Sequence, residues 1–266
     1  MNTTFTFPFG QPVKTLTQQD KSPKTHFVLG VYASAVHARW VFEGKQRIAA
    51  LAVASEPYIF WKGDGADKII AEIKIPPGAG TLEAVPQNMN GPSGRSLNEC
   101  FLSPLGIERK DAWLCDIVPH SCCNQKQAKA IEKKYVPLMK DFPLLPEASL
   151  PPVPNPLCDD KRRDEILAEL KESEAGTIVL LGDDPIKWFL SFYDRKWKRL
   201  GDFVKDSKPY GKPHKIRIDG KDYDVLPLVH PRQASKLGIH SSDWIKLHRE
   251  WMAAKNAEKL NERKIR

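Results

Sequence analysis

The chain has 266 residues, a formal net charge of +8 at neutral pH and a pI near 9.1, which permits one large domain or two small ones with a sizeable core. No apolar stretch approaches the roughly 20 residues that a membrane helix needs, so a membrane protein is excluded. Five cysteines without a Cys-x-x-Cys pair exclude a disulfide scaffold, and together with an N-terminus lacking a secretory signal pattern they predict a cytoplasmic protein.

Hydrophobic patterning predicts alternating strands and helices. The predicted strands, in chain order, cover 26–32, 40–42, 48–53, 112–118, 177–182, 215–218 and 223–229. The predicted helices cover 67–73, the residues after Phe101, 126–139, the residues after Asp159 or Asp160, those after Pro185, and the C-terminal end. In two places a short turn separates consecutive strands, so each pair is expected to form a β-hairpin. The pairs are 40–42 with 48–53 and 215–218 with 223–229.

The segments between these elements carry further expectations. Residues 1–25, rich in Thr, Gln, Pro and Lys, are expected to be loosely ordered, and 91–96 to form a tight loop. Asp183 and Asp184 are expected to cap the helix that follows them. The spacing of the aromatic residues in that helix favours one buried face over a stacking surface, and these residues are Trp188, Phe189 and Phe192.

Four of the apolar strands are separated by helices. This alternation predicts an α/β fold, a three-layer α/β/α sandwich around a central, mainly parallel four-stranded sheet. We expect a single domain over 26–252, followed by a basic helix end over 253–266. In a parallel sheet the carboxyl ends of the strands meet at one edge, where open α/β sheets bind ligands. The residues expected there are Tyr32, Ala33, Ser34, Asp116, Gly182, Asp183, His230 and Pro231.

Positive charge is concentrated in two stretches. Ten lysines and arginines lie between residues 195 and 221, and five lie between residues 255 and 266. A clustered basic surface suits a polyanion, because each neutralised phosphate releases counterions. A polyanion is therefore the favoured partner, and a cationic surface that serves only solubility is the alternative.

The order and spacing of these motifs resemble those of the uracil-DNA glycosylase superfamily over most of the chain. Gly30-Val31-Tyr32-Ala33-Ser34 stands at the first motif of that superfamily, Asp116 at its base-reading position, and His230-Pro231-Arg232-Gln233 at its His-Pro-Ser-type motif. Residues 91–107 with 113–118 also resemble the loop, helix and strand of the smaller bacterial members. The resemblance implies a glycosylase-like fold and cleavage of an N-glycosidic bond.

The resemblance also implies roles for individual residues. His230 would donate a hydrogen bond to O2 of the leaving base, and Asp116 would bind the base edge or orient water. Because the base must leave the stack, residues 30–34 would line a base pocket. The residues expected to contact DNA are Gly91, Ser93, Gly94, Arg95, Pro231, Arg232 and Gln233, with Arg232 or Gln233 as the wedge that fills the gap. The plainer alternatives are a strand-end histidine satisfied by local hydrogen bonds, a capping aspartate and an ordinary turn at 91–95.

Three positions depart from the family pattern and bear on the substrate. Tyr32 stands where many members have an Asp or Asn that positions the attacking water, and a tyrosine cannot act as a carboxylate base. Asp116 replaces the Asn of uracil-reading members, and a carboxylate suits the N4 amine of cytosine. Ser34 is small where a bulky Tyr blocks C5 substituents. Together they favour a C5-modified cytosine of phage DNA, as in antiviral glycosylases of this superfamily, over uracil or hydroxymethyluracil.

The sequence also permits two other functions. A non-catalytic DNA-binding or damage-sensing domain would use the same basic surface, and Tyr32 favours it. A small-molecule hydrolase is disfavoured, since the chain has neither a Gly-x-Ser-x-Gly elbow nor a phosphate-binding Gly-x-x-x-x-Gly-Lys loop. We expect a monomer without cofactor or iron–sulfur cluster. Adjacent cysteines rarely share one metal ion in tetrahedral geometry, which argues against a site made of Cys115, His120, Cys122 and Cys123.

Overall fold

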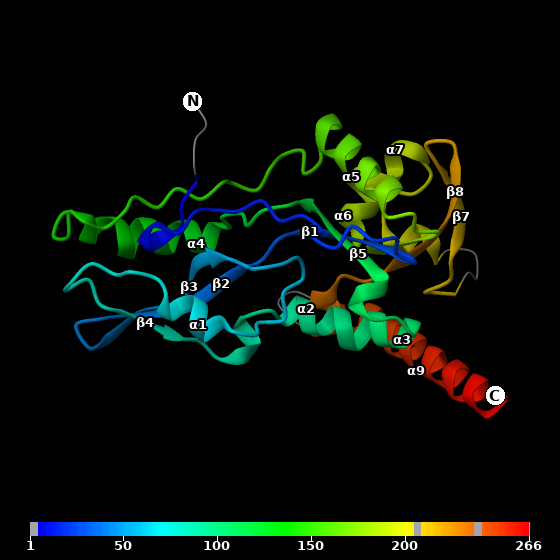
Figure 1. Cartoon of the computed structure of the whole chain (residues 1–266), viewed down its shortest axis with the longest axis horizontal. Coiled ribbons are helices and arrows are strands. Elements are labelled where there is room, and N and C mark those ends of the chain that lie inside the picture. Colours follow the sequence, from blue (N-terminus) through cyan, green and yellow to red (C-terminus); the bar gives the residue numbers. More distant parts are fainter. Residues whose placement is uncertain (1–4, 205–208, 237–240, 266) are drawn as a thin grey trace. The chain divides into compact units, whose positions relative to one another are not determined.

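A computed structural model describes residues 5–204, 209–236 and 241–265, and the side chains of 262–265 are outside that description. Of the basic residues noted above, Lys205, Lys208 and Arg266 lie outside the described residues. The chain divides into two compact units (Figure 1). Unit 1 comprises Met1–Leu16, Tyr32–Pro92 and Val118–Pro154, and unit 2 comprises Thr17–Val31, Ser93–Ile117 and Asn155–Arg266. The prediction of one domain over 26–252 did not anticipate this division.

Unit 2 is built on a mixed five-stranded sheet with the order β5-β1-β6-β8-β7. Its strands are β1 (His26–Tyr32), β5 (Ala112–Val118), β6 (Thr177–Leu181), β7 (His214–Ile218) and β8 (Lys221–Leu228). β1 pairs with β6 and β6 with β8 in parallel, whereas β7 pairs antiparallel with β8. The predicted four-stranded sheet is therefore wrong by one strand: the hairpin turn at Asp219 and Gly220, both at positive φ, adds β7 at the edge.

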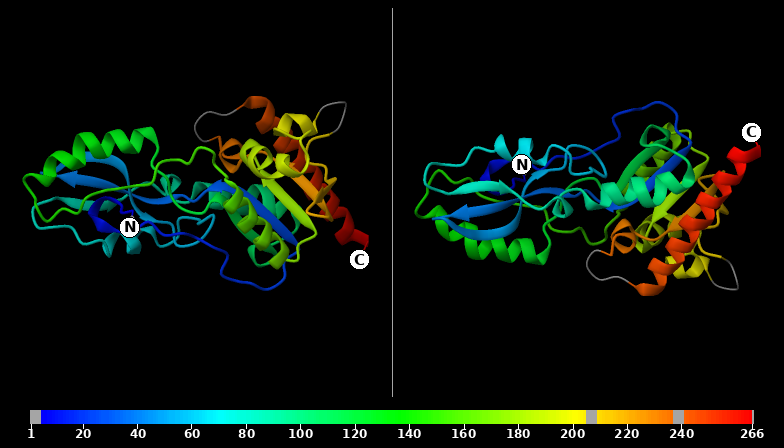
Figure 2. Two further views of the ribbon diagram at one scale, coloured as in Figure 1. Left: turned by 90° about the horizontal axis from the view of Figure 1, so that it is seen from above. Right: turned by 90° about the horizontal axis from the view of Figure 1, so that it is seen from below.

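Helices cover both faces of the sheet in unit 2, an arrangement compatible with a three-layer α/β/α fold. Figures 1 and 2 show α5 on one face, and α3 and α9 on the other. The helices are α2 (Pro92–Ser96), η3 (Leu97–Leu102), α3 (Ser103–Leu105), η4 (Arg109–Asp111), α5 (Asp160–Glu172), α6 (Asp183–Pro185), η7 (Ile186–Leu190), α7 (Ser191–Tyr193), η8 (Leu200–Phe203), α8 (Pro231–Ala234) and α9 (Ser242–Ile265). Every residue of β5 is buried, as expected for a strand covered on both faces.

Unit 1 contains a separate three-stranded antiparallel sheet with the order β3-β2-β4. Its elements are η1 (Pro8–Gly10), β2 (Ala35–Phe42), β3 (Lys45–Ser55), α1 (Ala66–Ala71), β4 (Thr81–Ala84), η2 (Gln87–Met89), α4 (Gln125–Ala130), η5 (Ile131–Tyr135) and η6 (Val136–Met139). The predicted hairpin is confirmed, since β2 and β3 are joined by a turn with Glu43 and Gly44 at positive φ. The third strand, β4, was not predicted.

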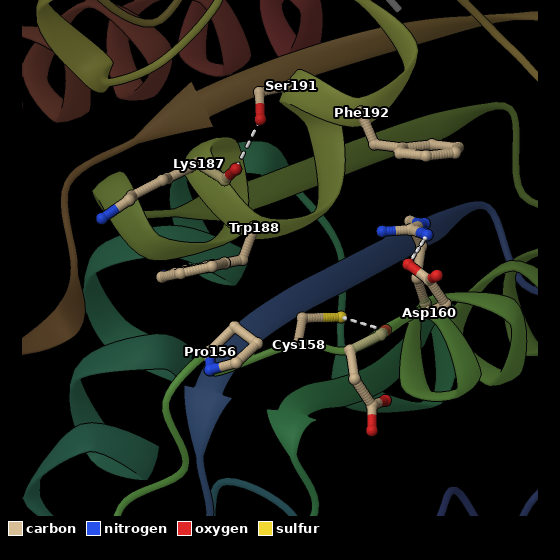
Figure 3. A pocket seen from close by; sticks show the side chains of 9 residues that line it. Pro156, Cys158, Asp160, Lys187, Trp188, Ser191 and Phe192 are labelled. Atoms are coloured by element: carbon tan, nitrogen blue, oxygen red, sulfur yellow. Dashed lines mark hydrogen bonds and ion pairs between the residues drawn. The ribbon is translucent and has the colours of Figure 1, made fainter.

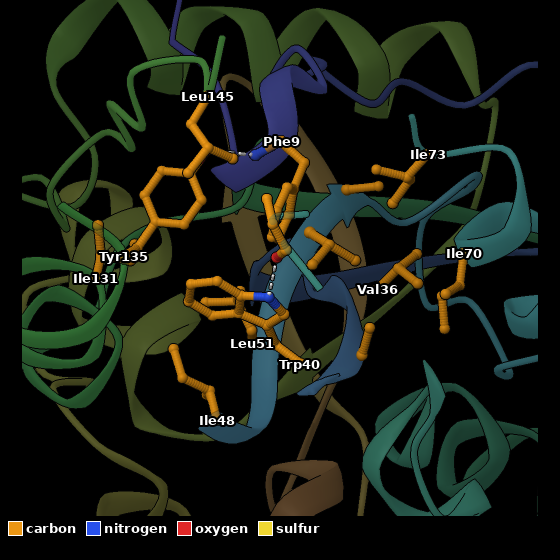
Figure 4. Packing of buried hydrophobic residues seen from close by; sticks show 14 of the residues in the cluster. Phe9, Val36, Trp40, Ile48, Leu51, Ile70, Ile73, Ile131, Tyr135 and Leu145 are labelled. Atoms are coloured by element: carbon orange, nitrogen blue, oxygen red, sulfur yellow. Dashed lines mark hydrogen bonds between the residues drawn. The ribbon is translucent and has the colours of Figure 1, made fainter. Parts of the chain in front are cut away.

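The N-terminal segment is part of the core of unit 1. Phe7 is fully buried, and the Phe9 ring meets Trp40 edge-on with ring centres 5.5 Å apart (Figure 4). The backbone N–H of Phe9 donates to the Tyr135 hydroxyl over 3.0 Å. The prediction of loose order over 1–25 is therefore wrong for residues 7–9. The polar composition of the segment obscured two phenylalanines that pack in the core.

Two predictions about the helix after β6 are also wrong. Asp183 does not cap it: its carboxylate accepts the backbone N–H of Leu200 over 2.7 Å, and Gly182 stands at the N-cap. The three aromatic residues do not share a buried face, because Phe189 is fully buried while Phe192 is 59% exposed. The helix includes a π-helical segment, η7, whose longer turn breaks the 3.6-residue period on which the prediction relied.

Candidate active site

His230 directly follows Val229 at the carboxyl end of β8 and is the N-cap of α8, as the sequence predicts for a residue before proline. Its Nδ1 accepts the backbone N–H of Arg232 over 3.1 Å. This hydrogen bond is the one expected under the alternative interpretation, in which His230 is a strand-end histidine satisfied by local hydrogen bonds. It also fixes the tautomer, since a neutral ring whose Nδ1 accepts carries its proton on Nε2. His230 therefore presents Nε2–H as a hydrogen-bond donor.

The environment of His230 keeps the ring neutral. Burial lowers its pKa to about 4, and the nearby Arg232 charge acts in the same direction. At neutral pH the side chain is therefore an uncharged donor rather than an imidazolium. A neutral N–H donor can stabilise negative charge that develops on a ligand. It does so without the cost of keeping a buried positive charge on the ring before the ligand binds.

A chain of buried polar groups holds the backbone just before His230. The Val229 N–H donates to the Tyr210 hydroxyl over 2.9 Å, and that hydroxyl lies 2.8 Å from Nδ1 of His248. Nε2 of His248 lies 3.0 Å from the carbonyl oxygen of Cys100, which can only accept. His248 therefore carries its proton on Nε2 and accepts from Tyr210, so every direction in the chain is determined.

Contacts on other sides of His230 complete this support. The Ser96 hydroxyl donates to the Pro231 carbonyl over 3.2 Å, tying the helix that begins at Pro92 to α8. Gly182 lies against His230 at the end of β6, and a Cβ added there would be 3.1 Å from Cβ of His230. Its φ of +92° with a ψ of −169° is a conformation that is essentially restricted to glycine. Gly182 was expected at this edge from the sequence. Tyr210, His248 and Ser96 were not singled out, because their roles depend on contacts between distant segments.

Asp116 lies inside β5 rather than after its end, and only 4% of it is exposed. Burial raises the pKa of its carboxyl to about 7, a rise that the nearby Arg162 charge partly opposes. Cys115 contacts Arg162 of α5, so alternation along the strand points the Asp116 side chain to the opposite face of the sheet. Its carboxylate makes no hydrogen bond to another described residue, which leaves it available to a ligand.

The sheet order separates the two predicted catalytic residues. β5 and β8 are three strand spacings apart, with β1 and β6 between them. At about 4.8 Å per spacing, this places the backbones of Asp116 and His230 about 14 Å apart across the sheet. The chain order reverses at β1, which has β5 on one side and β6 on the other, and such a reversal is where open α/β sheets form a ligand crevice. Asp116 and His230 thus lie on strands to either side of this reversal and do not touch each other.

The predicted base-pocket residues are divided between the two units. Gly30 and Val31 are buried within β1 in unit 2, whereas Tyr32, the last residue of β1, is 44% exposed and begins the next segment of unit 1. Within unit 1, the Ala33 N–H donates to the Val118 carbonyl, and the Ser34 carbonyl accepts the Ser121 hydroxyl. Ala33 and Ser34 therefore follow the strand instead of continuing it.

The predicted tight loop over 91–96 is wrong, because a helix begins at Pro92 and includes Ser93, Gly94 and Arg95, whose contact with DNA stays a prediction. Gly94 is buried, and its carbonyl accepts from the Arg109 guanidinium over 3.4 Å. Gly91 packs against the backbone at 62–63, where an added Cβ would be 2.1 Å from the nitrogen of Gly63. These backbones approach too closely for a phosphate to enter between them.

The predicted DNA-contacting residues after His230 differ in how exposed their side chains are and in whether these are already hydrogen-bonded. Pro231 is buried, and the Gln233 side-chain oxygen accepts the backbone N–H of Ser241 over 2.8 Å, which joins α8 to the segment before α9. Arg232 is exposed. Of the two candidate wedge residues, Arg232 is therefore the one free to reach a ligand.

The described residues contain no group of three side chains suited to holding a metal ion, and no described helix could cross a membrane. All five cysteines are free thiols. In comparison with known proteins, no family model and no curated sequence matches the chain. The case for a function therefore rests on the geometry around His230 and Asp116.

Proposed function

We propose that the chain is a monofunctional DNA glycosylase that hydrolyses the N-glycosidic bond of a flipped-out modified pyrimidine. The observation that carries the proposal is the neutral His230, which presents Nε2–H at the carboxyl edge of the sheet beside Gly182. Cleavage of this bond leaves negative charge on the departing base. A donor held at O2 of the base stabilises that charge, and the contacts around His230 prepare the donor before the substrate arrives.

Asp116 is the proposed base-reading group. With a pKa of about 7, it is part ionised at neutral pH, and the ionised form accepts a hydrogen bond from an amine. Cytosine presents an N4 amine, whereas uracil presents O4, which cannot donate. A C5-modified cytosine is therefore the preferred substrate, and uracil or hydroxymethyluracil is the alternative. The separation of about 14 Å assigns His230 and Asp116 to two different edges of the bound base, O2 and the N4 amine.

An abasic-site assay tests the proposal. Duplex and single-stranded DNA containing 5-hydroxymethylcytosine, its glucosylated form, uracil or hydroxymethyluracil is incubated with the protein and then treated with mild alkali. We expect strand scission at a modified cytosine. His230→Ala should lower the rate about 100-fold or more, the usual loss for one preorganised donor. His26→Ala is the matched control, because His26 begins β1 at the opposite edge of the sheet.

A second candidate function is DNA binding without catalysis. It is favoured by Tyr32, which supplies no carboxylate, and by the engagement of His230 Nδ1 with the Arg232 backbone N–H. Salt-sensitive DNA binding without scission of any of the four substrates would support this candidate and refute the glycosylase.

A further inference from the structure

Unit 2 has a cavity of about 440 Å³ between the start of α5 and the helix that follows β6 (Figure 3). Its volume is within the range of small-ligand sites. Trp188 and Phe192 form one side, and Pro156 and Cys158 form another. Nothing in the proposed cleavage at His230 uses these residues.

The aromatic rings of the cavity are accompanied by cations. The Arg163 guanidinium lies 3.6 Å from the centre of the Phe192 ring, and the Lys187 ammonium lies 4.6 Å from that of Trp188. Arg163 also pairs with Asp160, and its buried Nε has no hydrogen-bond partner among the described residues. Because Arg163 covers only one face of Phe192, which is 59% exposed, the ring retains surface for stacking.

Positive charge continues along the chain from this cavity. Five exposed cations lie between residues 187 and 199, namely Lys187, Arg195, Lys196, Lys198 and Arg199. Two of them are in ion pairs, Lys196 with Asp194 and Arg199 with Asp202. An exposed aromatic ring next to cations is the combination that binds single-stranded nucleic acid, in which bases stack on rings and phosphates follow the charge.

The cavity lies toward the same edge of the sheet as His230. Arg162, in the first turn of α5, donates to the carbonyls of Asp116 and Ile117 near the end of β5. The helix with Trp188 begins directly after β6. A strand of DNA bound at the carboxyl edge would therefore pass near the cavity.

We propose that this cavity binds an unpaired base of a single-stranded stretch of DNA, stacked on Phe192 and Trp188, while Lys187 contacts its phosphate. The proposal rests on the DNA partner of the proposed function and adds a site for the strand outside the cleavage site. A duplex exposes only base edges and phosphates, so its bases cannot use these rings. A stacking site therefore selects unpaired DNA.

Fluorescence anisotropy at one fixed, low salt concentration tests this site. The two probes are a labelled oligothymidylate of about 12 nucleotides and an oligomer of equal length and charge built from abasic units, which carries phosphates but no bases. We expect the protein to prefer the oligothymidylate about 5-fold or more. Phe192→Leu and Trp188→Leu should each remove that preference and leave binding of the abasic oligomer unchanged.

Leu260→Ala is the matched control, because Leu260 is also 59% exposed but lies on α9. It should change neither affinity. Phe192 is exposed, so its replacement should preserve the fold, and circular dichroism checks this for both variants. Equal affinity for the two oligomers, or unchanged preference in Phe192→Leu, would overturn the proposal. Displacement of the oligothymidylate by aromatic peptides, but not by unlabelled oligothymidylate, would also overturn it. His230→Ala should keep the preference, so failure of base excision and failure of this site are distinguishable.

Discussion

Tyr210→Phe tests whether the buried polar chain holds the segment that carries His230. The substitution removes only the hydroxyl, which accepts from Val229 and donates to His248. Both former partners are buried, with His248 at 1% exposed, so neither regains water as a partner. Leaving a buried polar group unsatisfied costs about 1–3 kcal/mol, so two such groups predict a loss of about 2–6 kcal/mol in the free energy of unfolding of unit 2.

Urea unfolding followed by far-UV circular dichroism measures that loss. Tyr193→Phe is the matched control, because the half-buried Tyr193 hydroxyl makes no hydrogen bond in the described part of the chain, and a change below about 0.5 kcal/mol is expected. A Tyr210→Phe loss within about 0.5 kcal/mol of the control would refute the reasoning. Nitrogen NMR of the His230 ring provides a second measurement: the Nδ1 and Nε2 signals of the wild type should indicate the Nε2–H tautomer, and the variant should weaken that preference.

Three further predictions concern Asp116, Gly182 and Phe9. The Asp116 carboxyl has a folded pKa of about 7 against 3.8, so between pH 4 and 7 the unfolded chain loses this proton first and the stability of unit 2 falls as pH rises. Asp116→Asn should therefore raise stability at pH 8 by up to about 4 kcal/mol and leave it unchanged at pH 4, as measured by thermal unfolding, while abolishing excision of a modified cytosine. Gly182→Ala should cost about 1–3 kcal/mol and slow excision, because its backbone conformation excludes a side chain and an added methyl group would push against His230; normal stability and activity would contradict this. Phe9→Ala should destabilise unit 1 by about 3–5 kcal/mol in urea, and a change below 1 kcal/mol would show that the N-terminal segment is not part of that core.

Local sequence patterns predicted the elements of the fold well and their grouping poorly. The strands at 26–32, 112–118 and 177–182 were recognisable because each is an apolar run between breakers, and Asp219-Gly220 identified its hairpin from turn chemistry alone. The separate sheet of unit 1 was missed. Strands β2 and β3 follow β1 directly in sequence, and no composition change at Tyr32 marks the passage from one unit to the other.

The candidate site shows the same limit. The position of His230 at a strand end could be predicted, since Pro231 stops the strand one residue later. The tautomer of its ring could not, because it depends on the Arg232 backbone, and neither could the contribution of His248, which lies on a helix whose neighbouring tryptophans suggest only packing. Asp116 was expected at the ligand-binding edge and lies inside β5, two residues before its end at Val118, although the predicted strand 112–118 has the same bounds as β5.

The separation of Asp116 and His230 limits the mechanisms that unit 2 can support. Two groups on strands about 14 Å apart cannot exchange a proton directly or bind the same atom. A reaction that requires an acid and a base in contact, such as hydrolysis by a nucleophile and its histidine, is therefore excluded for this pair. Cleavage of an N-glycosidic bond makes no such demand, because charge develops separately on the base and on the sugar. In the proposed cleavage, His230 acts as a single neutral donor at O2 and the Asp116 carboxylate binds the N4 amine at another edge of the base, so no contact between the two groups is needed.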